Sequence, residues 1–180
     1  MRVLGIDPGL RLTGFGCVEG GTEPMSPPEF VDAGVVRLAP GSGPTPSVPT
    51  RLGELERDLT EIIKQNQPEL IAIEALFSHP DHPFTAVQMA HARGVILLVA
   101  HRSGASIVEL PPADVKRALT GSGQAKKGQI QASVARILGM NEVPKPADIA
   151  DALAIAIAAR WQALLPAGIR RPGVYDRPRC

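Results

Sequence analysis

The sequence predicts an α/β fold in which a five-stranded mixed sheet, with the strand order 3-2-1-4-5, carries helices on both faces. Short apolar runs at residues 3–6 and 70–73 have no polar side, which is typical of strands buried in the middle of a covered sheet. From residue 52 onward, helical patterns alternate with strand patterns, as in α/β domains. The strand order places the first and fourth strands side by side at the centre of the sheet, where ligands of open α/β sheets gather.

The first three elements are expected to be strands at residues 2–7, 12–18 and 31–38. Pro8 and Gly9 stop the first strand and turn the chain towards the second. Because each strand follows the previous one closely, we expect an antiparallel meander.

Helices and strands then follow one another along the chain. Apolar residues at helical spacing (Leu52, Leu55, Leu59, Ile62 and Ile63) predict a helix that Pro68 separates from a strand ending at Glu74. Further helices are expected at residues 83–101, 112–119, 128–138 and 147–165, with a strand at 105–110. The predicted order is βββαβαβααα.

Two segments lack this periodicity. Residues 39–50 are rich in Pro, Gly and Ser, which predicts a mobile loop before the first helix. Residues 166–180 have a similar composition with four arginines, which predicts a disordered basic tail. The predicted domain therefore covers residues 1–165.

The charge of the chain is unevenly distributed. The net charge of the 180 residues is +1, but residues 1–81 hold 6 basic and 12 acidic side chains and residues 82–180 hold 13 basic and 6 acidic ones. This asymmetry suits a surface that binds a polyanion beside an acidic, metal-binding cleft, and solvated faces produce it about as often. Only 3% of the residues are aromatic, which disfavours a stacking platform for single strands and favours duplex or branched DNA.

The cysteines and the apolar segments indicate a compartment. Cys17 and Cys180 show no disulfide or zinc-binding spacing. We find neither the charged leader and apolar core of a signal peptide nor an apolar stretch of membrane-spanning length. We expect a soluble cytoplasmic protein that does not associate with membranes.

Four acidic residues are placed where a metal site would need them. Asp7 and Glu74 each close a predicted central strand, and Asp148 and Asp151 lie three residues apart at the start of the last helix, on one helical face. Clustered carboxylates repel one another unless they hold cations, and oxygen ligands suit Mg²⁺ or Mn²⁺ rather than zinc. Two such ions roughly 3.5–4 Å apart can activate water and stabilise the leaving oxygen in phosphodiester cleavage. The pattern predicts a metal-dependent nuclease.

A plainer interpretation exists for each acid alone. The helix dipole favours Asp in a first turn, and acids at strand ends are ordinary loop residues. The joint pattern of four acids on two central strands and one helix face is what favours the metal site.

Several motifs together resemble a known family. Four motifs occur in the order found in RuvC, the family of bacterial Holliday junction resolvases. They are Gly5-Ile6-Asp7-Pro8-Gly9, Thr13-Gly14, Ile73-Glu74 and the run Ala147-Asp148-Ile149-Ala150-Asp151-Ala152-Leu153-Ala154. The resemblance covers residues 1 to about 165, including Gln88, Ala92-Arg93-Gly94 and residues 111–116.

This resemblance implies a ribonuclease H-like fold, a homodimer, and divalent-metal hydrolysis of two phosphodiesters at a four-way DNA junction. It places the family's catalytic and metal-binding acids at Asp7, Glu74, Asp148 and Asp151. It also implies an aromatic that stacks on an unpaired base at Phe77, contacts to the DNA backbone at Lys116, Lys126 and Lys127, and the branch-migration proteins RuvA and RuvB as partners.

Two other classes of function compete with a junction nuclease. Actin-like ATPases and sugar kinases also open with an Asp-Gly turn after a strand, but they use two related domains where this chain has room for one. A non-catalytic junction-binding module would need only the basic half, and the presence of all four acids argues against it.

Overall fold

The computed structural model describes residues 1–75, 83–166 and 174–175. The first strands are β1 (Arg2–Asp7), β2 (Leu12–Glu19) and β3 (Glu29–Arg37). They are followed by α1 (Val48–Asn66), β4 (Leu70–Glu74), α2 (Pro83–Ser103) and β5 (Ser106–Leu110). The remaining elements are α3 (Pro112–Thr120), α4 (Lys127–Ile137), α5 (Ala147–Leu164) and β6 (Val174–Tyr175). Apart from β6, this is the predicted order of elements.

The strands form one mixed sheet in the order β3-β2-β1-β4-β5-β6. The meander β1–β2–β3 is antiparallel, and β1 pairs in parallel with β4, as β4 does with β5. The predicted order 3-2-1-4-5 is therefore confirmed, and Asp7 and Glu74 end adjacent central strands.

The sheet has one strand more than predicted. Val174 and Tyr175 pair antiparallel with β5, at positions where we expected a disordered tail. A polar, Pro-rich composition indicates disorder. It does not show that β5 has an unpaired edge, to which a short segment can add as a further strand. The rest of the predicted tail beyond Pro166 lies outside the described residues.

The first helix also begins earlier than predicted, inside the segment that we expected to be a loop. The Ser47 hydroxyl accepts a hydrogen bond from the Thr50 amide at 3.3 Å and so caps the helix, and Pro49 lies in its first turn. Ser and Pro are turn formers, but they are equally the residues that start helices.

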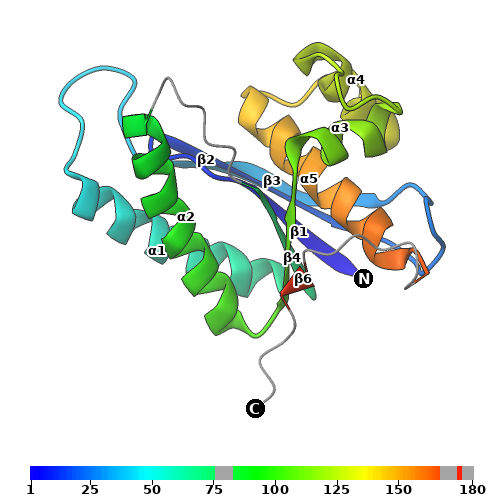
Figure 1. Cartoon of the computed structure of the whole chain (residues 1–180), viewed down its shortest axis with the longest axis horizontal. Helices are drawn as coiled ribbons and strands as arrows, with labels where there is room; N and C mark the ends of the chain where they lie inside the picture. The colour runs from blue at the N-terminus through cyan, green and yellow to red at the C-terminus, as the bar shows by residue number, and fades with distance from the viewer. Residues whose placement is uncertain (76–82, 167–173, 176–180) are drawn as a thin grey trace.

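Helices cover both faces of the sheet (Figure 1). One core forms where α1 and α2 pack on residues such as Leu4, Ile6, Ile71 and Ile73, and the other forms where α3, α4 and α5 meet Val3, Leu70, Ala72 and Val108. Side chains alternate between the faces along each strand. Asp7 and Glu74 therefore both project from the face that α5 covers.

In the described part of the chain, every helix is too short or too polar to cross a bilayer.

Candidate active site

The site is brought together by a close contact between α5 and the β1–β2 hairpin. Gly14 pairs with Asp7, and a Cβ atom built on Gly14 would lie 2.8 Å from the carbonyl carbon of Asp148. A Cβ on Gly5 would lie 2.6 Å from the backbone nitrogen of Ala156. Glycines on the strands thus let the helix backbone approach the sheet, which carries Asp148 and Asp151 to the end of β1.

Three of the four acids line one cavity of about 270 Å³, which we call the acidic cleft. Its polar lining consists of Asp7, Glu74, Asp151, Lys116 and Lys127. Its apolar wall comes from α3, α4 and α5 together (Pro112, Val115, Ile130, Ala154 and Ile155). Asp148 does not line the cleft, but it is close enough for its charge to act on Asp7.

Asp7 has more negative than positive charge around it in the cleft. Burial, followed by the charges of Glu74, Asp151 and Asp148, raises the pKa of Asp7 to about 7, against only one lowering influence, Lys127. Burial and the charge of Asp151 also raise the pKa of Glu74, while Lys116 and Lys127 lower it. The cleft carries more negative charge than its own cations balance.

Two of the three predicted DNA-contacting lysines lie in this cleft. The Lys127 ammonium is 2.7 Å from Asp151 Oδ2, and this contact raises the pKa of Lys127. Lys116, on α3, lines the same cleft as Glu74, and its charge lowers the pKa of that carboxyl group. Lys126 is exposed at the start of α4 and is not among the cleft residues. Phe77 lies outside the described residues.

The ligand chemistry of the cleft fits a hard divalent cation. Carboxylate oxygens are what Mg²⁺ and Mn²⁺ prefer, and the unbalanced charge around Asp7 is what a cation would neutralise. In residues 1–75, 83–166 and 174–175, no three His, Cys, Asp or Glu side chains converge enough to hold one ion as they stand. The carboxylates would therefore have to turn towards one another to share an ion, and Lys127 already occupies Oδ2 of Asp151.

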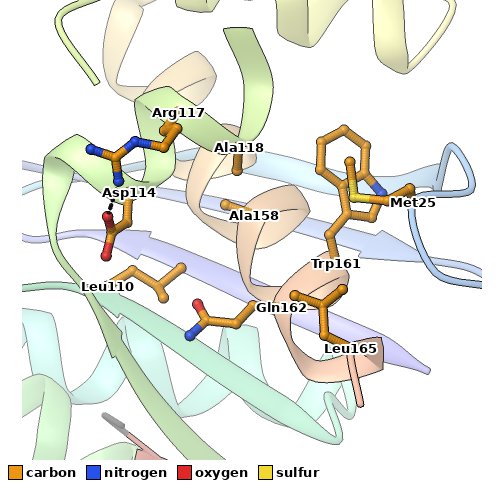
Figure 2. A pocket seen from close by; sticks show the side chains of 9 residues that line it. All are labelled: Met25, Leu110, Asp114, Arg117, Ala118, Ala158, Trp161, Gln162 and Leu165. Atoms are coloured by element: carbon orange, nitrogen blue, oxygen red, sulfur yellow. Dashed lines mark hydrogen bonds and ion pairs between the residues drawn. The ribbon is translucent and has the colours of Figure 1, made fainter. Parts of the chain in front are cut away.

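A second cavity, of about 290 Å³, lies between α3, the end of α5 and β5 (Figure 2). Its walls are mainly apolar, from Met25, Leu110 and Trp161 among others, with the ion pair of Arg117 and Asp114 at 2.7 Å on one side. None of the four acids lines this cavity, so its size does not make it the candidate site.

A side chain on the other face of the sheet contacts the backbone of Glu74, and the sequence did not reveal this contact. Arg93, buried on α2, donates a hydrogen bond to the carbonyl oxygen of Glu74 at 2.7 Å. The motif Ala92-Arg93-Gly94 contributed to the resemblance, but nothing in the sequence linked it to Glu74.

The chain is similar to known junction endonucleases along most of its length. The family model for crossover junction endodeoxyribonuclease RuvC matches residues 3–159. The RuvC crossover junction endodeoxyribonuclease of a Synechococcus species is 40% identical over 162 residues, which is 90% of this chain and 99% of that one. The RuvC of Caldicellulosiruptor saccharolyticus is 44% identical over 157 residues, 87% of this chain and 90% of that protein.

A solved structure shares the fold. Thermus thermophilus RuvC in complex with a Holliday junction substrate superposes with a TM-score of 0.80 at 31% identity, covering 91% of this chain and 95% of that one. This likeness agrees with the ribonuclease H-like architecture that the resemblance implied. With a family model that matches most of the residues and relatives at about 40% identity, the chain belongs to the RuvC family of crossover junction endodeoxyribonucleases.

Proposed function

We propose that this chain resolves four-way DNA junctions by hydrolysing one phosphodiester in each of two strands, with Asp7, Glu74, Asp148 and Asp151 as its catalytic acids. The observation that carries this proposal is the acidic cleft, in which α5 and two central strands supply carboxylates to one cavity. Residues 1–165 are proposed as the nuclease domain.

The proposed cofactor is Mg²⁺ or Mn²⁺, with two ions in each site. Asp7, Glu74 and Asp151 would hold them, with Asp148 at the edge of the set. When bound, such ions lower the pKa of water and stabilise the charge that develops on the leaving oxygen.

The residues of the chain have their own roles in the proposed reaction. The acids supply a negative electrostatic field, which attracts cations and repels a phosphate group that has no cation bound to it. Lys116 and Lys127 lie at the same cavity and can pair with phosphate oxygens next to the scissile bond. Lys126, exposed beside Lys127, is proposed to contact the backbone further out, and Phe77 to stack on an unpaired base.

A homodimer is the proposed working form. A four-way junction has near two-fold symmetry, and two cuts need two sites that a C₂ dimer supplies. The exposed side of α2 supports this proposal, since Val87 and Leu98 are 55% and 45% exposed and lie on the same helical stripe as the exposed His91 and Gly94. We further propose that the protein is cytoplasmic, because junctions arise in chromosomal DNA. For the same reason we propose that it acts together with the branch-migration proteins RuvA and RuvB.

The test is incubation of the protein with a synthetic four-way junction, a linear duplex of the same sequence, and ATP, each with and without Mg²⁺ or Mn²⁺. A junction nuclease cuts the junction only with metal and releases no phosphate from ATP. Junction binding without any cutting would support a non-catalytic module, and ATP hydrolysis would support the actin-like alternative.

A further inference from the structure

A buried arginine lies on the face of the sheet opposite the acidic cleft. This residue, Arg93, belongs to α2 and is 8% exposed. One of its terminal nitrogens, Nη1, donates to the Glu74 carbonyl oxygen at 2.7 Å, and the other, Nη2, forms an ion pair with Glu109 of β5. Arg93 therefore joins α2 to the ends of two neighbouring parallel strands.

The two glutamates project from opposite faces of the sheet. Ile73 packs in the core that α1 and α2 cover, so its neighbour Glu74 projects towards α5 and the acidic cleft. Leu110 packs in the core that α5 covers, so its neighbour Glu109 projects towards α2. Arg93 thus contacts only the backbone of Glu74 and does not line the cleft.

The Glu74 carbonyl lies where the regular strand pairing stops. Among the described residues, which stop at Ala75 here, the Ala75 amide makes the last bond of this ladder, to the Leu110 carbonyl oxygen at 2.9 Å. The Glu74 carbonyl and the Ala75 amide belong to one peptide plane, which is attached to the Cα atom that carries the Glu74 side chain. The bond to Leu110 holds this plane at its N–H, and a partner for the carbonyl oxygen holds it at the other end as well. The Arg93 guanidinium supplies a partner at this point and is itself oriented by Glu109.

We propose that Arg93, with Glu109, is a positioning residue that fixes the backbone of Glu74 and so aims the Glu74 carboxylate into the acidic cleft. A planar guanidinium can hold a carboxylate and a carbonyl oxygen at once in a fixed geometry, whereas a lysine ammonium offers a single centre. The catalytic consequence rests on the proposed function, but the effect on the backbone does not.

A purely structural role predicts different behaviour. If Arg93 only neutralised Glu109 or filled space under α2, its conservative replacement would lower the melting temperature of the whole protein. It would not affect the Ala75 amide selectively, and folded molecules would cut junctions at the normal rate.

The experiment compares Arg93→Lys with Arg102→Lys. Arg102 makes the matched control because it lies on the same helix and also pairs with a glutamate, Glu56 of α1, at 3.7 Å, on an exposed surface. Hydrogen exchange is measured at the Ala75 amide and at amides of β1. Cutting is measured in a single turnover from a preformed junction complex.

For Arg93→Lys we expect exchange at Ala75 to be about tenfold faster and cutting about tenfold slower, as when one charged hydrogen bond is removed, with β1 exchange and junction binding unchanged. Arg102→Lys should change none of these. Glu109→Gln, a milder change at a residue whose side chain is 20% exposed, should give the same pattern at smaller amplitude if Arg93→Lys does not fold.

Unchanged exchange at Ala75 in the folded Arg93 and Glu109 variants would overturn the proposal, as would faster exchange with normal cutting. If the unaltered protein cuts no junction, the proposed function fails, and exchange at Ala75 still decides whether Arg93 holds Glu74.

Discussion

The carboxyl group of Asp7 sits in surroundings that disfavour its charged form. Its pKa is about 7, raised by burial and by three neighbouring acids. The folded protein therefore keeps a proton on Asp7 over a pH range in which the unfolded chain, with a pKa near 3.8, has lost it. Between these two values the folded state binds more protons, so the free energy of unfolding falls as the pH rises.

A first prediction concerns stability without metal. Asp7→Asn should raise the free energy of unfolding at pH 8 by about 1–3 kcal/mol, because it removes a buried charge among like charges. The gain should shrink towards pH 4, where Asp7 is protonated in the folded state. Urea unfolding at both values in the presence of a chelator measures it. An Asn variant less stable than the parent at pH 8 would show that Asp7 is not electrostatically disfavoured.

A second prediction concerns catalysis by the same acids. Asp7→Asn, Glu74→Gln and Asp151→Asn should each abolish junction cleavage and leave junction binding nearly intact, because several kcal/mol of transition-state stabilisation depends on ligand placement. Asp148→Asn should impair cutting as well. Gel-shift affinity and single-turnover cutting are measured together. Asp58→Asn, on α1 at the opposite face, is the control and should cut normally.

A third prediction concerns the lysines. Lys116→Ala and the double change of Lys126 and Lys127 to Ala should weaken junction binding similarly on different sequences. They should also reduce the slope of log affinity against log salt by about 0.9 for each phosphate group that the variant no longer neutralises. The measurement is a salt titration of binding beside Lys64→Ala, an exposed lysine on α1. A slope equal to that of the parent in both variants would remove these lysines from the DNA interface.

At the scale of elements, the position of α5 depends on glycines in the strands below it. Gly5, Gly14 and Gly16 each lie where an added Cβ would overlap α5 atoms. Half of the acid set is carried by α5, so the distance between this helix and the sheet decides whether Asp148 and Asp151 reach Asp7.

A fourth prediction tests this contact. Gly14→Ala should push α5 away from β2, destabilise the fold by about 1–3 kcal/mol as overpacking does, and slow cutting beyond the fraction that is unfolded. Gly53→Ala, on the exposed side of α1 with open space around it, should be neutral or stabilising. Thermal melts and single-turnover cutting of both variants provide the comparison. Normal cutting by folded Gly14→Ala would mean that the acids tolerate a displaced helix.

The regular elements were predictable because their patterns are local. Buried runs such as residues 3–6 and 70–73, and apolar residues at helical spacing, identify strands and helices whatever surrounds them. The predicted start of α1 was wrong because Ser47 and Pro49 suit both loops and helix starts. The strand β6 was missed because it forms only by extending an edge that the rest of the chain has already built.

At the scale of the whole molecule, the sheet order explains how much of the site was predictable. Once β1 and β4 are neighbours and parallel, acids at their ends must lie together, so Asp7 and Glu74 followed from the topology. The pairing of Lys127 with Asp151 and the reach of Arg93 to the Glu74 carbonyl did not follow, because both join distant segments by side-chain geometry. The roles of all these residues stay predictions.

The central claim is that the acidic cleft makes this chain a metal-dependent junction nuclease. The most direct measurement maps cut positions on all four strands of a mobile four-way junction in Mg²⁺ or Mn²⁺, for the parent protein and Asp7→Asn side by side. We predict paired cuts at symmetric positions in two strands of like polarity, none without metal, and none from Asp7→Asn although it binds the junction. Cutting by Asp7→Asn at the parental rate, or cutting by the parent protein in the presence of a chelator, would contradict this claim.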